Sequence, residues 1–321
     1  MAVVLGFDGG GTHSEAILLS GEGRILGHGT GGTAHEWYGQ GHLVEGSVRD
    51  ALATALPADA PRPGLAVLTG PSGGRASEIL QEAIGPSTLL RVSEAECFLA
   101  SSLRTTGMVV LAGTGSFVYG RARDGRWMSA GGAGPVIGDH GSGFDLGLRA
   151  IRAACLAAQL RSYRGPLTDA VLEAFECEQR WDLVTLYHTN PPSRLQIAAL
   201  APIVTRHAEQ GDPVALQILD EAAHELSALA AGVLEELGIY REETVILAGG
   251  AAEATAYQEA LRRHLAPLFA GPVDICRPKY RPAVGAAFVG LKYLGVEWSE
   301  ELIGTLDSDL AAWGLAGAAK E

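Results

Sequence analysis

Short apolar runs alternate with longer stretches of helical periodicity along the chain, a pattern typical of α/β proteins. The elements fall into two series, each of which begins with three closely spaced strands. The first series is expected to contain strands at 3–7, 15–20, 24–30, 64–70 and 89–96, and helices at 43–56 and 75–83. The second is expected to contain strands within 107–116, 117–122, 126–132, 244–254 and 272–278, and helices within 142–160, 163–190, 194–210, 213–237 and 283–294.

The order strand-strand-strand-helix-strand-helix thus occurs twice, and the second copy carries a large helical insertion. Such a duplication predicts two lobes with a cleft between them, which is a common place for a ligand. We place the boundary near residue 106, which gives an N-terminal lobe of residues 1–106 and a C-terminal lobe of residues 107–321. A return of the last helix to the N-terminal lobe is left open.

Glycine, with 43 residues, gathers where the expected strands end. Asp8-Gly-Gly-Gly-Thr12 follows the first strand, and Gly113-Thr-Gly-Ser116 holds the matching place in the second series. Glycines in such hairpins leave N–H groups that can point at phosphate oxygens, and the Thr and Ser hydroxyls add donors. Asp8, at the strand end, can hold Mg²⁺ through water. Either loop alone is equally explained as a plain turn, but two at equivalent points favour phosphate binding.

A third turn, Gly249-Gly-Ala-Ala252, lies between a strand and a helix, where the backbone can pass close under a flat nucleoside. On its own it is better explained as a simple strand-to-helix turn. The chain has no G-x-x-x-x-G-K-[ST] sequence, so a Walker A loop is excluded. No G-x-G-x-x-G opens a helix after a strand, which argues against a Rossmann site.

The net charge of −13 comes with no basic patch, so nucleic acid is not an expected partner. No apolar run approaches the roughly 20 residues that span a bilayer, and MAVVLGFDGGG is too short and Gly-rich for a secretion signal. The four cysteines, Cys97, Cys155, Cys177 and Cys276, form no C-x-x-C pair, which argues against structural zinc and a disulfide scaffold. We therefore expect a cytoplasmic protein with no membrane partner.

The two hairpins, the Gly-Gly turn and the segment GGAGPVIGDHGSGFDLG at 131–147 together resemble the BadF/BadG/BcrA/BcrD ATPase family, and within it the N-acetylglucosamine and glucosamine kinases. The resemblance extends from about residue 3 to 294, with the motifs in the family's order. It implies a two-lobed actin-like ATPase fold (duplicated ribonuclease H-like α/β) with a central ATP cleft. It also implies a kinase that uses ATP and Mg²⁺ to phosphorylate N-acetylglucosamine, glucosamine or a related amino sugar.

The resemblance assigns site residues by position. Those implied to bind ATP are Gly9, Gly10, Gly11, Thr12, His13, Gly113, Thr114, Gly115, Ser116, Gly249, Gly250 and Ala251. Those implied to bind the sugar are His35, Ser72, Glu94, Gly132 and Asp139. Asp8 and Asp139 are implied to lie near the metal, partly through water.

Phosphoryl transfer depends mainly on in-line positioning and charge stabilisation, with a carboxylate that accepts or orients the acceptor hydroxyl proton. In the related kinases this carboxylate is an Asp within an Asn-Asp-Ala pattern, and the matching segment here is Val92-Ser93-Glu94-Ala95. Glu94 is therefore the expected base, together with Asp139 as the second catalytic carboxylate. Glu96 is the alternative base, and Glu94 is also explained as a carboxylate favoured at a helix N-terminus.

Four residues depart from the kinase pattern. His13 stands where Lys or Arg is usual, His35 where an Asn contacts the sugar, Ala133 where Trp is frequent, and His140 where GDEGS has Glu. A histidine beside the phosphates makes charge neutralisation weaker and pH-sensitive. The phosphate side is thus closer to the family pattern than the sugar side.

Two other functions are compatible with the sequence. One is an ATPase activator of a dehydratase or reductase, which would need cysteines for a [4Fe–4S] cluster. The other is a nucleotide-binding sensor that has lost transferase activity.

The insertion at 142–237 offers apolar faces for a homodimer, although these faces are equally explained as internal core. The tail from Trp298, with Leu302, Leu306, Leu310 and Trp313 at helical spacing, is expected to be a docking helix.

Overall fold

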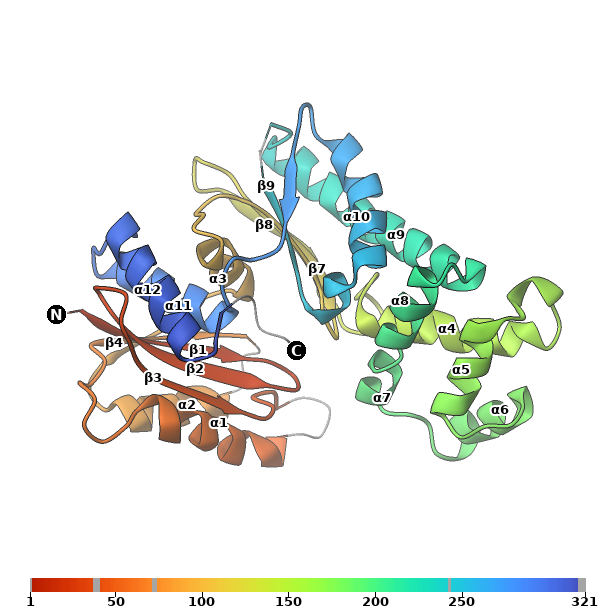
Figure 1. Ribbon diagram of the computed structural model, residues 1–321, viewed down its shortest axis with the longest axis horizontal. Helices are drawn as coiled ribbons and strands as arrows, with labels where there is room; N and C mark the ends of the chain where they lie inside the picture. The colour runs from red at the N-terminus through yellow and green to blue at the C-terminus, as the bar shows by residue number, and fades with distance from the viewer. Residues whose placement is uncertain (1, 37–40, 71–73, 242–243, 317–321) are drawn as a thin grey trace. The chain divides into compact units, whose positions relative to one another are not determined.

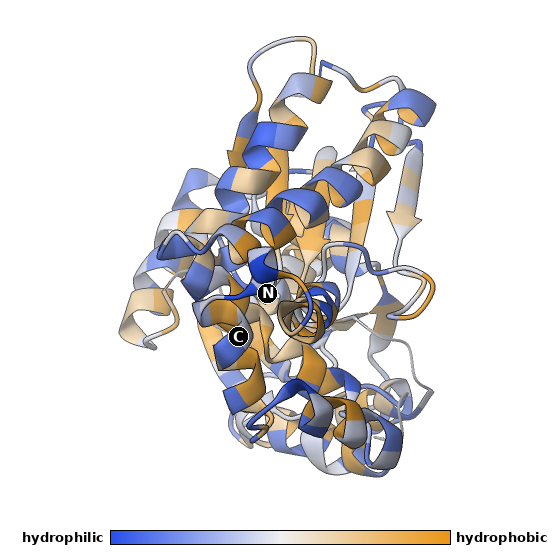
Figure 2. Cartoon of the chain, turned by 90° about the vertical axis from the view of Figure 1, so that its right-hand side faces the viewer, coloured by the Kyte–Doolittle hydropathy of each residue, from blue (hydrophilic) through white to orange (hydrophobic). Residues whose placement is uncertain are grey.

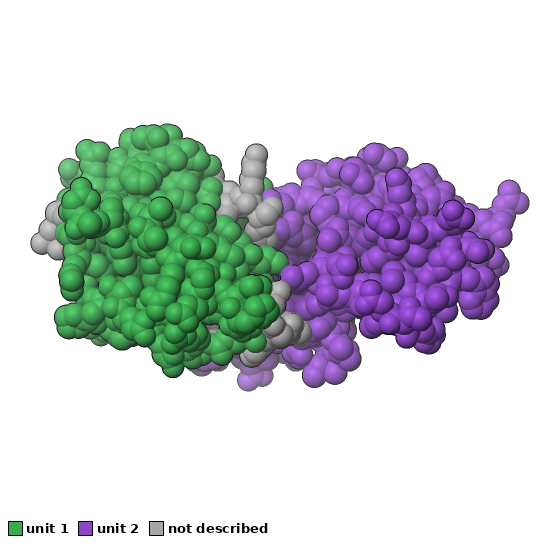
Figure 3. Space-filling view, turned by 90° about the horizontal axis from the view of Figure 1, so that it is seen from below, with its two compact units in different colours: residues 1–105, 277–321 green, residues 106–276 purple. Residues whose placement is uncertain are grey.

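The computed structural model describes residues 2–36, 41–70, 74–241 and 244–316. The chain forms two compact units, residues 1–105 with 277–321 (unit 1) and residues 106–276 (unit 2) (Figures 1 and 3). The expected C-terminal lobe of residues 107–321 therefore extends too far. The whole segment from Arg277 onward, and not only a last helix, belongs to unit 1.

Unit 1 is built on a five-stranded sheet with the order β3-β2-β1-β4-β5. Its strands are β1 (Val3–Gly9), β2 (Ser14–Ser20), β3 (Ile25–Gly31), β4 (Leu65–Thr69) and β5 (Thr88–Arg91). β2 is antiparallel to β1 and β3, whereas β4 and β5 run parallel to β1. Because side chains alternate between faces along a strand, Leu5 and Phe7 enter one core while Val4 enters the other.

Helices cover both faces of this sheet (Figure 1). They are α1 (Gly41–Ala55) and α2 (Gly74–Ile84) on one face, and α3 (Glu94–Ser101), α11 (Pro282–Tyr293) and α12 (Glu300–Ala312) on the other. α11 lies directly on β1, since a Cβ built on Gly6 would be 2.1 Å from the carbonyl oxygen of Ala283 and 2.6 Å from the N atom of Ala287. This close packing explains why the C-terminal segment belongs to unit 1.

Unit 2 repeats the same sheet. Its strands are β6 (Gly107–Ala112), β7 (Ser116–Arg121), β8 (Trp127–Gly131), β9 (Thr244–Ala248) and β10 (Asp274–Cys276), in the order β10-β9-β6-β7-β8. β7 is antiparallel to β6 and β8, and β9 is parallel to β6 and β10. Strand order and direction match unit 1 one for one, which confirms the predicted duplication.

The helices of unit 2 enclose one large core. They are α4 (Gly143–Ala157), α5 (Pro166–Ala174), α6 (Arg180–Thr189), α7 (Arg194–Ala198), α8 (Ala201–Glu209), α9 (Pro213–Leu237) and α10 (Thr255–Leu265), with short 3₁₀ turns at Arg161–Tyr163, Gly250–Glu253 and Ala266–Leu268. The single helix expected at 194–210 is two helices. Pro202, at the start of α8, has no N–H to continue the hydrogen-bond ladder of α7.

The hydropathy of the elements follows this layering. In Figure 2 the helices carry hydrophobic and hydrophilic stripes along their length. In α12 the predicted apolar face is confirmed for Leu302, Leu306 and Leu310, which are buried, but Trp313 follows the last helical turn and is 47% exposed. Within the described parts of the chain, no helix is long and apolar enough to cross a membrane.

A buried ionic cluster ties α11 to the sheet of unit 1. The carboxylate of Glu15, on β2, lies 2.8 Å from Nε2 of His28 and 2.9 Å from Nη1 of Arg281, which precedes α11. Burial alone raises the pKa of Glu15, but the hydrogen bond with His28 and the positive charge of Arg281 outweigh it. The pKa of Glu15 is therefore lowered from its usual 4.5.

A Glu15→Gln variant is expected to lose part of the pH dependence of stability. Because its folded-state pKa is depressed, the Glu15 carboxylate stabilises the protein above the unfolded-state pKa, and this contribution disappears as the pH falls through the folded value. At pH 7 the variant should be less stable by about 1–3 kcal/mol. Urea unfolding between pH 3 and pH 7 checks this, and equal pH slopes for both proteins would contradict it.

Candidate functional site

The first Gly-rich loop connects β1 to β2 in unit 1. The N–H of Gly10 donates to the carbonyl of His13 at 2.7 Å, and the N–H of Ala34 donates to the carbonyl of Gly10 at 3.1 Å. Gly10 thus closes the turn, whereas the N–H groups of Gly11 and Thr12 have no hydrogen-bond partner in the described part of the chain. These two amides are the ones that this hairpin can present to an anion.

The rim of this loop is polar. Thr12 and His13 are exposed at its tip, and a Cβ built on Gly11 would lie 3.3 Å from Cδ2 of His35. His35 is thus placed next to the loop, and its contact with a sugar stays a prediction. Ser72 lies outside the described residues.

The start of α3 distinguishes the two candidate bases. Ser93 caps the helix, and Oε2 of Glu96 accepts hydrogen bonds from N and Oγ of Ser93 at 3.2 and 3.1 Å. This capping box occupies the carboxylate of Glu96 in holding the helix end. Glu94 is the first residue of the helix and takes no part in the capping box. The strand expected at 89–96 ends at Arg91 because Ser93 begins the helix.

Three carboxylates act on a buried thiol of α3. The thiol of Cys97 is fully buried, and its pKa is raised well above the usual value, chiefly by burial and further by the charges of Asp8, Glu94 and Glu96.

The second Gly-rich loop connects β6 to β7 in unit 2. The N–H of Gly113 donates to the carbonyl of Gly115 at 2.9 Å and closes the hairpin. The hydroxyl of Ser116, the first residue of β7, donates to the carbonyl of His140 at 2.7 Å. That hydroxyl joins two segments of the protein, and its contact with a phosphate stays a prediction. Thr114 and Gly115 remain at the tip.

The predicted adenosine turn lies directly against this loop. Gly249 has φ +89°, and a Cβ on it would be 2.5 Å from both the carbonyl carbon of Ala112 and the N atom of Gly113. Only glycine combines this backbone conformation with so close an approach. The structure thus brings the turn at Gly249, Gly250 and Ala251 together with the loop at 113–116.

Asp139 is held in a constrained position beside the second loop. It is 3% exposed, and its φ of 55° is unusual for a residue other than glycine. Its Oδ1 accepts the N–H of Gly134 at 3.3 Å, and its Oδ2 lies 3.4 Å from Nη2 of Arg194. A buried carboxylate that is fixed in strained backbone is a feature of functional sites.

Glycines shape the loop that leads to Asp139. Gly131, Gly132 and Gly134 all have positive φ, and the N–H of Gly132 donates to the carbonyl of Ser116 at 2.9 Å. Ala133 is exposed, and its Cβ would be 2.8 Å from a Cβ on Gly138. Position 138 therefore requires glycine, because any Cβ there would clash with Ala133.

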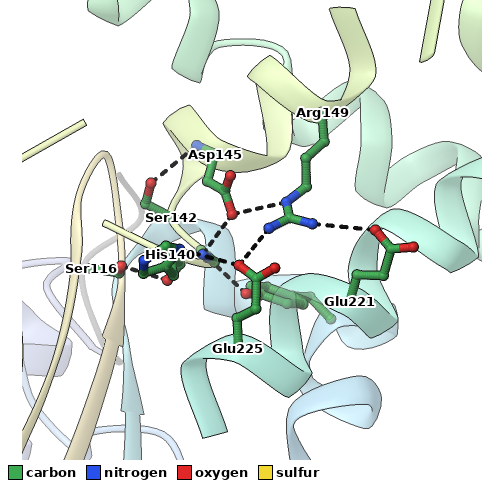
Figure 4. Close-up of polar contacts among 9 residues, drawn as sticks. Ser116, His140, Ser142, Asp145, Arg149, Glu221 and Glu225 are labelled. Carbon is green, nitrogen blue, oxygen red and sulfur yellow. Dashed lines mark hydrogen bonds and ion pairs between the residues drawn. The ribbon is translucent and has the colours of Figure 1, made fainter. Parts of the chain in front are cut away.

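An ionic network joins α4 to α9 (Figure 4). Nε of Arg149 lies 3.0 Å from Asp145, Nη2 lies 2.5 Å from Glu225, and Nη1 lies 3.3 Å from Glu221. Nδ1 of His140 is 3.2 Å from the same Oε2 of Glu225. Burial raises the pKa of Glu225, but Arg149 and then His140 outweigh it and lower that pKa overall.

The same network fixes the backbone on both sides of His140. Oδ2 of Asp145 accepts the N–H of Gly141 at 2.8 Å, and the hydroxyl of Tyr257 donates to the carbonyl of Gly141 at 2.7 Å. With the bond from Ser116, three anchors hold the 139–141 segment. His140 thus serves as part of the scaffold, which explains how the chain accommodates it in place of Glu.

Sequence reasoning missed Arg149, Arg194, Glu225 and Tyr257. Tyr257 and Glu225 lie far from 139–141 in sequence, and only the packed core brings them close. For Arg149 the spacing to Asp145, four residues along one helix, was an available signal.

The two matching sheets, each with a Gly-rich hairpin after its first strand, define an actin-like ATPase fold. The family model described as the BadF/BadG/BcrA/BcrD ATPase family matches residues 5–290. The chain belongs to this family.

Individual relatives carry kinase names. The chain is 34% identical over 163 residues, 50% of its length, to the N-acetylmuramic acid/N-acetylglucosamine kinase of Clostridium acetobutylicum. It is 29% identical over 58% of its length to the N-acetyl-D-glucosamine kinase of Dictyostelium discoideum. The matched parts span 53% and 59% of these two relatives. A solved structure from Chromobacterium violaceum, provisionally named an N-acetylglucosamine kinase, superposes with a TM-score of 0.67 at 27% identity, over 91% of this chain and 99% of that one.

Proposed function

We propose that this protein is an ATP-dependent sugar kinase that phosphorylates N-acetylglucosamine, glucosamine or a related amino sugar. The observation that carries the proposal is the presence of a Gly-rich hairpin at the same strand end of both units, each with a carboxylate nearby, Asp8 in unit 1 and Asp139 in unit 2. The kinase names of its relatives support the proposal.

The residues fit ATP and Mg²⁺. A Cβ on Gly115 would lie 3.0 Å from Oδ2 of Asp139, so the second loop keeps its bare backbone next to a carboxylate. Among the described residues, no group of three or more His, Cys, Asp or Glu side chains could hold a metal alone. Mg²⁺ is usually held by one or two carboxylates together with substrate phosphates and water. Asp8 and Asp139 are the residues proposed to hold it, and the bound ion would offset phosphate charge.

In the proposed reaction, the carboxylate of Glu94 accepts the proton of the sugar hydroxyl. The oxygen of that hydroxyl forms a bond to the γ-phosphorus of ATP, and the bond from this phosphorus to the β,γ-bridging oxygen breaks. The products are ADP and a sugar phosphate. The tip amides of Gly11, Thr12, Thr114 and Gly115 would bind phosphate oxygens, and the turn at Gly249 to Ala251 would lie against adenosine.

The residues proposed to set the sugar specificity are His35, Ser72, Gly132 and Ala133. We further propose that the protein acts in the cytoplasm, where ATP is available. A homodimer is the proposed assembly, and a mass measurement in solution tests it.

The test is Mg-ATP turnover with glucosamine, N-acetylglucosamine, N-acetylmuramic acid, glucose and mannose, measured as ADP release and as sugar phosphate by mass spectrometry. We expect one amino sugar to stimulate turnover and to appear as its monophosphate, because acceptor binding completes the site. Tight ATP binding without transfer to any sugar would overturn the proposal in favour of a nucleotide sensor. A brown protein after oxygen-free purification would point instead to a dehydratase activator with an iron–sulfur cluster.

A further inference from the structure

We propose that Arg194 binds the terminal phosphoryl group of ATP and stabilises the charge on that group during transfer. This inference rests on the proposed kinase function. Arg194 is the first residue of α7, within the helical insertion and outside every motif that the sequence singled out.

The guanidinium lies on the second loop itself. A Cβ built on Gly115 would be 3.0 Å from Nη2 of Arg194 and 3.0 Å from Oδ2 of Asp139. The carboxylate of Asp139 and the guanidinium of Arg194 thus both lie next to Gly115. A side chain at position 115 would crowd these two groups.

Close packing of backbone places Arg194 there. α7 is capped by Ser193 and Gln196, and a Cβ on Gly147 of α4 would be only 2.0 Å from the carbonyl oxygen of Ile197. α7 therefore lies directly against α4. The first residue of α4, Gly143, donates its N–H to the carbonyl of Gly113 at 2.7 Å. The loop, α4 and α7 thus form one continuous packed unit, which fixes the origin of the Arg194 side chain.

The chemistry of arginine suits the role. A guanidinium has five N–H donors on three nitrogen atoms and stays protonated, so it can contact a carboxylate and phosphate oxygens at the same time. Asp139 orients the group and is itself 3% exposed, and the Arg194 side chain is 18% exposed, so solvent screens the pair weakly. Arg194 neither gives nor takes a proton, and it acts on the charge of the transferring group.

The alternative is that Arg194 only neutralises Asp139. A neutralising role affects all nucleotides alike, whereas contact with the terminal phosphoryl group affects ATP and leaves ADP untouched. Titration calorimetry with Mg-ADP and with the Mg complex of the non-hydrolysable analogue AMP-PNP separates the two roles. The variants are Arg194→Gln, the charge-conserving Arg194→Lys and, as a matched control, Arg206→Gln, which removes an exposed arginine of α8 in the same insertion.

For Arg194→Gln we expect the Kd of AMP-PNP to rise at least about tenfold, because a charge-assisted contact is removed. The Kd of ADP should not change. With the best acceptor sugar, kcat should fall by roughly 100-fold or more. Arg194→Lys should lie between the wild type and Arg194→Gln, and Arg206→Gln should match the wild type. Equal weakening of both nucleotides, or of neither, would overturn the proposal.

Circular dichroism melting establishes that each variant is folded. If Arg194→Gln does not fold, the ratio of AMP-PNP affinity to ADP affinity in Arg194→Lys tests the proposal in the same way. The binding measurement needs no acceptor, so it tests Arg194 even where every sugar fails and the kinase function is overturned.

Discussion

Glu94→Gln is expected to abolish sugar phosphorylation while nucleotide binding is kept. The amide has the same shape as the carboxylate but cannot accept the proton of the acceptor hydroxyl, so kcat should fall by about 10²- to 10⁴-fold. ADP affinity, measured by titration calorimetry, should stay at the wild-type value because Glu94 is not among the residues proposed to bind ATP. The decisive measurement is single-turnover transfer of the γ-phosphoryl group to the best sugar.

Glu96→Gln is the matched control, two residues away on the same helix. Glutamine also fits the third position of a capping box, so its amide can replace the Oε2 contacts with Ser93 and hold the helix end. We expect stability and transfer rate close to those of the wild type. The opposite pattern, an active Glu94→Gln and an inactive Glu96→Gln, would make Glu96 the base.

Gly6→Ala is expected to destabilise unit 1 strongly. The new methyl group would lie 2.1 Å from the carbonyl oxygen of Ala283 and 2.6 Å from the N atom of Ala287, both of them backbone atoms of α11. No side chain can rotate to relieve this contact, so the helix must move off the sheet. Overpacking usually costs about 1–3 kcal/mol, and a backbone clash of this depth should cost about 3 kcal/mol or more. Urea unfolding followed by far-UV circular dichroism measures the loss.

Gly46→Ala provides the control for a methyl group added to a glycine of the same unit. Gly46 is exposed within α1, and a Cβ there would meet nothing within 4 Å. Alanine is the better helix former, so this variant should be more stable by roughly 0.5–1 kcal/mol. Similar stabilities for Gly6→Ala and Gly46→Ala would show that α11 does not press on β1 as described.

Local patterns predicted most of the architecture. Continuous apolar runs such as that of β1 are typical of strands covered on both faces, and both Gly-rich hairpins follow such runs. The repeat of the strand order was visible because both copies keep the same sequence of strands and turns. The capping box of Ser93 and Glu96 was also legible in the sequence, and applying it would have ended the preceding strand earlier.

Long-range contacts account for what the sequence did not predict. No residue near Arg194 in sequence indicates its contact with Asp139. The contact depends on Gly147, whose missing side chain lets α7 pack closely against α4. The hydroxyl of Ser116 is satisfied by His140, a partner 24 residues away. The boundary at Arg277 follows from the fit of α11 on Gly6, which joins positions at opposite ends of the chain.

The discontinuity of unit 1 sets an order on biosynthesis. Residues 106–276 of unit 2 are contiguous and leave the ribosome before α11, whereas the sheet of unit 1 must wait for residues 277–316 to cover Val4 and Leu65. Since domains fold as units once their residues are available, unit 1 should mature after unit 2, with one apolar sheet face exposed until residues 277–316 have been made. A nascent chain of this protein would therefore depend on chaperones chiefly through its N-terminal strands.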